Sequence, residues 1–383
     1  MQNPIKHLII LLLTMGCVNS NKPAIKEIMY IGTFEERNSQ GIYVFDFNRD
    51  SLSFRLLQTV PDQKSPSFLE IHPSGRFLYA VNRSSVITGK EWGTVSAFSI
   101  DTLTGMLALI NEQSTYGRGP CHISFNQSGE YAFVSNYNDG SLVVYAVSDN
   151  GSVSDSIQMV RHDGKGMNQQ RQEGPHVHSA IISPDDRFLY VADLGIDKVM
   201  IYELNSGSGL LKPAVIPFAE VMPGSGPRHF EIHPNGRIAY LAEELSSTTC
   251  VFSRDTALGA LTEIQRISSI PDGFTGHNTN ADIHADADGR FLYVSNRGHN
   301  SLAIYAINED GLLSVTGYQS TLGDGPRNFL IDHTGSYLFV ANRNSDDIRV
   351  FRINRESGLP VFTGITLEVP GAVCIKMLQL TGK

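Results

Sequence analysis

The residues of this sequence best suited to chemistry are a small set of arginines, histidines and acidic or amide side chains. They are Arg228, Arg297, Arg327, His176, His178, His229, Glu243, Glu244 and Asn280. A guanidinium keeps its charge at physiological pH and binds a carboxylate or phosphate through two parallel hydrogen bonds. One such arginine would more often pair with a neighbouring carboxylate, whereas three aimed at one site favour a small anionic ligand. A glutamate or histidine beside them can move a proton.

These residues belong to a repeat with a period close to fifty residues. The motif Gly-Pro-Arg-His at 226–229 begins one copy, and Gly-Pro pairs at 174–175 and 325–326 begin two others. The prolines at 66, 120, 175, 227 and 326 follow one another at steps of 54, 55, 52 and 99 residues, and the last step spans two copies. Repetition at such a period is typical of solenoids and propellers.

Within one copy, an apolar strand leads through a Pro-x-Gly-Arg type of turn to a Phe-Leu-Tyr-Val type of strand, and two more strands follow. Four short strands in fifty residues form a propeller blade. Six copies are complete, and segments 27–32 and 41–45 join 373–377 in a seventh. We therefore predict one all-β domain over 27–383. It is a seven-bladed β-propeller with four antiparallel strands per blade, closed by pairing of the N- and C-terminal strands, which leaves no open edge.

Propeller topology decides which side chains meet. The first strand of each blade runs along the central channel and the second strand returns, so the start of the first and the end of the second lie on one face. The chemistry-bearing residues above all occupy these two positions. The sequence therefore predicts that they converge on one mouth of the channel.

The histidines and cysteines give little sign of a metal site. His176 and His178 are two residues apart and would share one face of a strand, which allows metal ligation. The spacing fixes no third ligand, and a histidine that moves a proton needs no metal. Cys121, Cys250 and Cys374 are scattered and form no CxxC pair, so neither a disulfide framework nor a thiolate zinc site is expected. We predict no metal and no cofactor.

The N-terminus has the pattern of an export signal. Two polar residues, Lys6 and His7, precede an apolar run over 8–13 that is too short to cross a bilayer, and Gly16-Cys17 follows. This resembles the lipobox of bacterial lipoproteins, although Thr14 stands where leucine is usual. We expect a lipoprotein-type signal peptide over 1–17, a linker over 18–26, and a periplasmic protein that touches the membrane only through a lipid on Cys17. Plain secretion and a cytoplasmic location are the alternatives.

The charge balance excludes one class of partner. Lys and Arg number 30 against 39 Asp and Glu, which gives a formal net charge of −9, and no basic run interrupts this balance. Nucleic-acid binding needs a basic patch or stripe. We therefore expect neither DNA nor RNA as a partner.

Three groups of motifs carry a resemblance to a known family. They are Gly-Pro-Arg-His at 226–229 with His-Pro at 233–234, Glu-Leu-Ser-Ser at 244–247, and Ala-Asp-Ile-His at 281–284 with Asp-Gly-Arg at 288–290. From about residue 27 onward the chain resembles the bacterial propeller 6-phosphogluconolactonases and their relatives, the fungal carboxymuconate-lactonizing enzymes. The resemblance implies a cofactor-free lactonase whose catalytic set carries over to His178, Arg228, Glu244 and Arg297. Glu243 leaves the register of Glu244 open by one residue. The remaining residues of the set, His176, His229, Asn280 and Arg327, are expected to bind substrate.

Three functions remain to be distinguished. In a lactonase, Glu244 or His178 activates a water that attacks the lactone carbonyl, while arginines stabilise the oxyanion. A lactonizing cycloisomerase would instead add a carboxylate across a double bond with His178 as the acid. A surface-anchored propeller without catalysis would only bind a ligand. Because an exported protein meets no cytosolic pool of phosphorylated lactone, we expect an unphosphorylated or acidic sugar lactone as the substrate. We also expect the enzyme to be a monomer.

Overall fold

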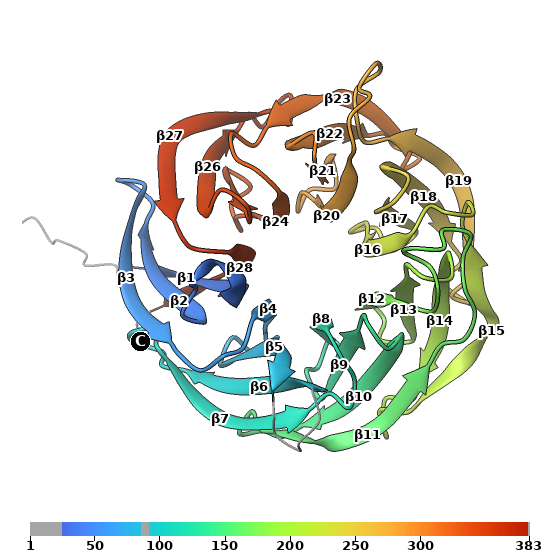
Figure 1. Ribbon diagram of the computed structural model, residues 1–383, viewed down its shortest axis with the longest axis horizontal. Helices are drawn as coiled ribbons and strands as arrows, with labels where there is room; N and C mark the ends of the chain where they lie inside the picture. Colours follow the sequence, from blue (N-terminus) through green and yellow to red (C-terminus); the bar gives the residue numbers. More distant parts are fainter. Residues whose placement is uncertain (1–24, 86–91, 382–383) are drawn as a thin grey trace, which may run out of the picture.

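Seven four-stranded antiparallel sheets form a ring around a central channel (Figure 1). This computed structural model describes residues 25–85 and 92–381. The expected signal peptide, with Cys17, lies outside the described residues. Within them no helix is long and apolar enough to span a bilayer. The propeller predicted from the repeat is confirmed, including its number of blades.

Blade 1 closes the ring because it contains both ends of the chain. Its strands, from the channel outward, are β28 (Ala372–Thr381), β1 (Ile25–Thr33), β2 (Ile42–Asn48) and β3 (Ser53–Val60), and the short 3-10 helix η1 (Glu35–Arg37) follows β1. Ile25 pairs with Thr381 and Gly32 with Cys374. The predicted closure is therefore confirmed, but the strand includes residues 25 and 26, which the sequence analysis assigned to the linker.

The other six blades follow in chain order, each with its first strand at the channel. Blade 2 consists of β4 (Pro66–Ile71), β5 (Phe77–Ser85), β6 (Trp92–Ile100) and β7 (Leu107–Ser114), and blade 3 of β8 (Pro120–Phe125), β9 (Tyr131–Asn136), β10 (Ser141–Val147) and β11 (Val153–Arg161). Blade 4 consists of β12 (Val177–Ile182), β13 (Phe188–Asp193), β14 (Lys198–Leu204) and β15 (Leu211–Glu220), and blade 5 of β16 (Pro227–Ile232), β17 (Ile238–Glu243), β18 (Thr248–Arg254) and β19 (Leu261–Ser268). Blade 6 consists of β20 (Thr279–Ala285), β21 (Phe291–Arg297), β22 (Ser301–Ile307) and β23 (Leu313–Ser320), and blade 7 of β24 (Pro326–Ile331), β25 (Tyr337–Asn342), β26 (Asp347–Ile353) and β27 (Pro360–Glu368).

A repeated tyrosine contact fixes the spacing between blades. On β5, the buried Tyr79 donates its hydroxyl to the carbonyl oxygen of Gly151 at 2.7 Å, in the outer turn of the next blade. The same contact is made by Tyr30, Tyr190, Tyr240 and Tyr293. Each hydroxyl is thereby satisfied within the apolar layer between two blades, as a buried polar group must be.

The innermost strand of every blade has a β-bulge near its start, where the channel opens. In β16, Pro227 pairs with Glu243 and His229 with Ala242, so Arg228 falls between two pairs. The residues displaced in the same way in the other single-residue bulges are Ser67, Cys121, His178, Arg327 and Val373, and in β20 they are Ala281 and Asp282. A bulge re-aims a side chain out of the regular alternation. The chain therefore presents an irregular set of side chains at the point where the channel opens.

Candidate active site

A polar cavity of about 380 Å³ lies at the mouth of the channel, on the face where the first strands begin. Its lining residues are Arg83, Cys121, Tyr137, Arg171, His178, Glu244, His277, Thr279, Arg297 and Arg327. They come from blades 2 to 7 and from the segment that joins blades 3 and 4. Of the eight residues expected to act on or bind substrate, His178, Glu244, Arg297 and Arg327 line this cavity directly.

The carboxylate of Glu244 is held by three guanidinium groups. Its Oε1 lies 2.6 Å from Nη2 of Arg171, and its Oε2 lies 3.0 Å from Nε of Arg228 and 3.1 Å from Nη2 of Arg297. Glu244 is only 5% exposed. Burial alone would raise its pKa, but the charges of Arg297, Arg228 and Arg171 outweigh burial and hold the pKa well below its usual range. A carboxylate of this kind is a weak base, and its main effect is to hold three cations together.

The neighbouring Glu243 is excluded from the cavity. Its carboxylate is fully buried and pairs with Arg266 at 2.5 Å, and Thr248 donates a hydrogen bond to it. These partners lie on the outer strands β19 and β18 of blade 5. The structure therefore places Glu244, and not Glu243, at the mouth.

Arg228 lies deeper than the sequence analysis placed it. It is 1% exposed, and its Nη1 donates to the carbonyl oxygen of Ala281 at 2.5 Å. Burial and the charge of Arg297 lower the pKa of Arg228 to about 10, so the guanidinium remains charged at neutral pH. Arg228 forms part of the floor beneath the mouth and not of its rim, because the bulge turns it into the channel.

Arg171 is a member of the site that the sequence analysis did not single out. It lies between β11 and β12, where Gln172 anchors the backbone by donating to the Leu194 carbonyl at 2.8 Å and to Asp197 at 2.7 Å. Arg171 also donates to the hydroxyl of Tyr137 at 3.1 Å. Segment 162–176 is the longest connection between described blades. This length was the only feature of the sequence that could have pointed to a functional residue here, because an irregular segment has no hydrophobic periodicity.

Two further arginines bring uncompensated charge to the cavity. The guanidinium carbons of Arg83 and Arg327 lie 5.1 and 5.2 Å from the ring centre of Phe34. Among the described residues, no ion pair joins either arginine to a carboxylate. Burial and the charges of Arg228, Arg297 and Arg83 lower the pKa of Arg327 well below its ordinary value. An anionic group of a ligand would relieve this repulsion.

His178 lines the cavity as a neutral ring. It is 3% exposed, and burial, followed by the charge of Arg228, holds its pKa well below the ordinary value. Its Nδ1 has no hydrogen-bond partner within the described part of the chain. His178 can thus offer an imidazole to a ligand, but no carboxylate orients that ring.

Two expected substrate-binding residues stand behind the lining. His176 stacks on Tyr137 with ring centres 4.5 Å apart, and its Nδ1 lies 2.9 Å from the Tyr137 carbonyl oxygen. The side-chain amide of Asn280 donates to the Thr248 carbonyl, and the backbone carbonyl oxygen of Asn280 accepts from Nη2 of Arg297 at 2.7 Å. Both therefore support lining residues from behind, and their contact with substrate stays a prediction. The Oδ1 of Asn280 is buried without a hydrogen-bond partner among the described residues.

The described residues contain no group of three or more His, Cys, Asp or Glu side chains arranged to hold a metal ion. Cys121, Cys250 and Cys374 are buried free thiols. Burial raises the pKa of Cys121 to about 11, so its sulfur is a poor nucleophile at neutral pH. The charged or proton-moving groups among the lining residues are guanidinium, imidazole and carboxylate, with the hydroxyls of Tyr137 and Thr279 beside them.

Comparisons with known proteins agree with this geometry. A family model described as "Lactonase, 7-bladed beta-propeller" matches residues 28–377. The chain is 34% identical to the 6-phosphogluconolactonase of Bacillus subtilis over 92% of this chain and 99% of the relative, and 38% identical to that of Formosa agariphila over 79% and 86%. The structure of a periplasmic gluconolactonase from Pseudomonas aeruginosa superposes with a TM-score of 0.85 at 33% identity, covering 93% of this chain and all of that one. The chain belongs to the family of seven-bladed β-propeller lactonases.

Proposed function

We propose that this lactonase hydrolyses an acidic, unphosphorylated sugar lactone at the channel mouth. The export-signal pattern supports an unphosphorylated substrate, and one structural observation supports its anionic group. Arg83 and Arg327, which have no carboxylate partner among the described residues, line the same cavity as the clamp of arginines around Glu244. A lactone that carries a carboxylate could place its ester carbonyl at the clamp and the carboxylate at Arg83 and Arg327.

The clamp supplies charge where the reaction develops it. When a water oxygen bonds to the lactone carbonyl carbon, negative charge moves to the carbonyl oxygen, and preorganised cations stabilise it. A guanidinium has five N–H donors, so Arg171 and Arg297 can bond Glu244 and still offer donors to the cavity. The ring C–O bond then breaks, and the proton taken from water ends on the departing oxygen.

The state of His178 favours hydrolysis over the cycloisomerase alternative. A cycloisomerase needs a protonated acid at this position, but burial keeps the pKa of His178 well below its ordinary value. The ring is therefore neutral at pH 7 and a poor proton donor. A binding protein without catalysis remains an outcome of the following test.

Gluconolactone, glucarolactone and 6-phosphogluconolactone should be hydrolysed at different rates by the purified mature chain in a pH-stat. We expect the highest kcat/KM for glucarolactone, whose carboxylate can pair with Arg83 and Arg327, and no change on adding EDTA. Activity lost with EDTA and restored by Zn²⁺, Ca²⁺ or Mg²⁺ would contradict metal independence. Equal rates for gluconolactone and glucarolactone would contradict the acidic substrate, and consumption of a muconate diene would favour the cycloisomerase.

We further propose that the protein is a periplasmic monomer anchored through a lipid on Cys17. The lipobox-like motif supports this, and the structurally similar protein from Pseudomonas aeruginosa is described as periplasmic. As the second strand of its blade, β1 begins on the face opposite the channel mouth. A chain anchored before Ile25 would therefore be attached at the face opposite the mouth.

Cys17→Ala should move the protein from the membrane fraction to the soluble fraction, because a thioether-linked lipid needs the cysteine sulfur. The intact mass of the wild-type protein should lack residues 1–16 and include added acyl chains. A mature wild-type protein that retains Met1, or that carries no acyl mass, contradicts the anchor. Sedimentation of the soluble variant should give the mass of one chain.

A further inference from the structure

Beneath the mouth lies a second cavity of about 10 Å³, close to the size needed for one water molecule. Arg228 and His229 line it, and it shares Cys121 and Arg327 with the mouth cavity. The two spaces therefore adjoin at the floor of the site. A water held here would lie next to the arginine clamp and below any bound lactone.

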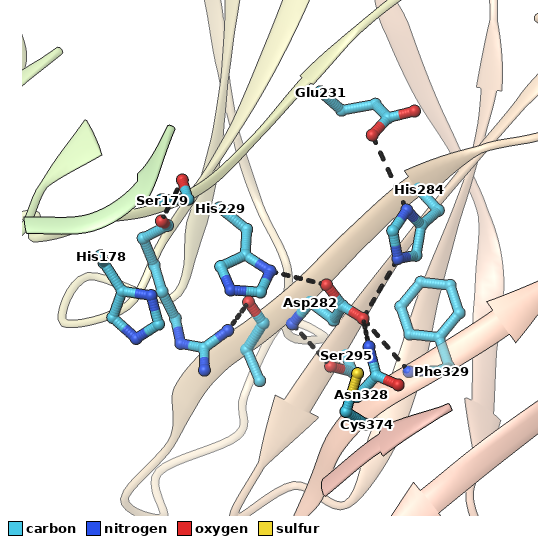
Figure 2. Close-up of polar contacts among 12 residues, drawn as sticks. His178, Ser179, His229, Glu231, Asp282, His284, Ser295, Asn328, Phe329 and Cys374 are labelled. Carbon is cyan, nitrogen blue, oxygen red and sulfur yellow. Dashed lines mark hydrogen bonds and ion pairs between the residues drawn. The ribbon is translucent and has the colours of Figure 1, made fainter. Parts of the chain in front are cut away.

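His229 is the titratable side chain of this inner cavity that has an orienting partner. Its Nδ1 lies 2.7 Å from Oδ1 of Asp282, on the neighbouring blade. The ring packs edge-on against His178, with ring centres 5.2 Å apart. Figure 2 shows His229 between His178 and Asp282, with its Nδ1 toward the carboxylate. His229 is 8% exposed and lies in the channel, not in a blade core.

The Asp282 carboxylate is fixed on its other side as well. Its Oδ2 accepts from the Asn328 amide, from the Phe329 backbone N–H at 3.2 Å, and from Nε2 of His284 at 3.2 Å (Figure 2). The Asp282 N–H donates to Ser295 at 2.9 Å. This network holds one carboxylate geometry, in the way that the aspartate of a Ser-His-Asp triad is held.

These bonds also settle which nitrogen of His229 carries the proton. Burial would raise the pKa of Asp282, but His284 and His229 outweigh it and keep the pKa well below its ordinary value. An ionised Asp282 can only accept a hydrogen bond, so Nδ1 of His229 carries the proton and donates to it, and the lone pair of His229 is on Nε2. Burial, followed by the charge of Arg228, lowers the pKa of His229 to about 4, which keeps the ring neutral at pH 7. An anionic substrate beside Arg228 would offset that charge and increase the basicity of Nε2.

We propose that His229 is the general base of the hydrolysis and that Asp282 is its positioning residue. The proposal rests on the lactonase function above and names the group that moves the proton. His229 Nε2 takes a proton from the water of the inner cavity as the water oxygen bonds to the carbonyl carbon. The ring C–O bond breaks, and the proton passes from Nε2 to the departing oxygen, so the imidazole returns to its neutral form.

The two alternative bases lack this arrangement. Glu244 is held as an anion by three arginines, and His178 has no carboxylate on its Nδ1 within the described chain. His229 combines a fixed carboxylate, an adjoining water-sized space and an Nε2 that has no hydrogen-bond partner among the described residues. Only this combination both orients the imidazole and stabilises the imidazolium that forms.

The test compares His229→Asn, Asp282→Asn and the double variant on glucarolactone and gluconolactone. His229→Asn keeps an N–H for Asp282 but has no Nε2, so kcat should fall by about 10²–10⁴ while KM changes by less than threefold. The kcat of Asp282→Asn should fall by a similar factor, because an amide at this position favours the wrong tautomer of His229. The double variant should be no slower than the slower single one, since the two groups act as a unit.

His122→Asn is the matched control, because His122 is equally buried and its ring centre lies 5.7 Å from that of His229, but it has no ion pair with a carboxylate in the described chain. We expect its kcat within threefold of wild type. Added imidazole should partly restore His229→Ala, a rescue that a purely structural role would not give. The titratable and charged groups that act on His229 are His178, His122, Arg228, Asp282 and His284, and loss of the Asp282 charge should change the acid limb of the kcat/KM profile.

Either of two results overturns the proposal while the wild type remains active. The first is a His229→Asn enzyme that keeps a third or more of the wild-type kcat. The second is a double variant whose loss of kcat equals the product of the losses in the two single variants. If Asp282→Asn fails to fold, His229→Asn with imidazole rescue of His229→Ala decides alone. A wild type that hydrolyses neither lactone would instead contradict the proposed function, so the two failures are distinguishable.

Discussion

Glu244→Gln is expected to lower kcat/KM at least a hundredfold and to lower the Tm by roughly 5 °C. The substitution keeps the shape of the side chain but removes the charge that holds Arg171, Arg228 and Arg297 together. Breaking a buried ion pair costs about 3–5 kcal/mol, because a desolvated charge is left without a partner. With about 2.1 cal/mol/K of unfolding entropy per residue, that loss corresponds to a few degrees in a domain of this size.

The loss of activity and the loss of stability in Glu244→Gln together show whether Glu244 is a counter-ion or a base. If Glu244 were the base, the amide would lower kcat and leave the Tm unchanged. If it is the counter-ion of the clamp, the guanidiniums separate, and both activity and stability fall. Calorimetry and initial rates on the same preparation separate these cases, and an unchanged Tm would contradict the counter-ion role.

Glu243→Gln is the matched control. Glu243 is also buried and paired with an arginine, but the pair lies on the outer side of blade 5. This variant should lose stability and keep kcat/KM within about threefold. A large loss of activity in Glu243→Gln would show that damage to blade 5, and not the clamp, explains the effect.

The acid side of the stability curve gives a second readout for Glu244. Its pKa in the folded protein is lowered from its ordinary value of 4.5. The stabilisation is therefore present above about pH 4.5 and is lost as the pH falls through the folded-state pKa. The Tm of the wild type should fall more steeply below pH 4.5 than that of Glu244→Gln. Parallel curves would mean that Glu244 contributes no such linkage.

The fold could be predicted from the sequence because the patterns that indicate it are local and repeated. A period near fifty residues, four short strands per copy and one incomplete copy at each end of the chain were sufficient to predict seven blades and their closure. The convergence of Glu244, Arg297 and Arg327 also followed, because strand direction alone assigns a residue to one face.

The β-bulges explain why the site itself was only partly predictable. Side chains alternate in a regular strand, so His176 and His178 were expected to share a face. The bulge displaces His178 from the ladder, and it lines the cavity while His176 supports Tyr137 from behind. A one-residue shift of this kind reverses the side on which a residue lies, and no periodic pattern reveals it.

Contacts between blades were hidden for a different reason. Asp282 was noticed as part of a motif but was given no role, because its partner His229 is 53 residues away. Such a pair depends on the rotation between neighbouring blades. The spacing of hydrophobic residues in the sequence gives no information about that rotation, so a pair of this kind can be identified only from the structure.

Arg327→Met is expected to raise the KM for glucarolactone by roughly 10- to 150-fold and to leave the KM for gluconolactone within about twofold. A charge-assisted hydrogen bond contributes about 1.5–3 kcal/mol, and each 1.4 kcal/mol is a factor of ten. Methionine fills a similar volume without a charge. Arg327 lies at Phe34 with Arg83, so Arg83→Met should act in the same direction.

Arg343→Met serves as the control for this pair. Arg343 also lies over Phe34, at 4.5 Å, but Glu36 already neutralises it at 2.6 Å, and it does not line the cavity. The Arg343→Met substitution should change the KM for glucarolactone and the KM for gluconolactone by no more than about threefold. Because the effect of Arg327 is assigned to charge, high salt should weaken glucarolactone binding to the wild type more than to Arg327→Met. An equal rise in KM for gluconolactone would assign Arg327 to the shape of the mouth instead, and the acid group of the substrate would then have to bind at the Glu244 clamp.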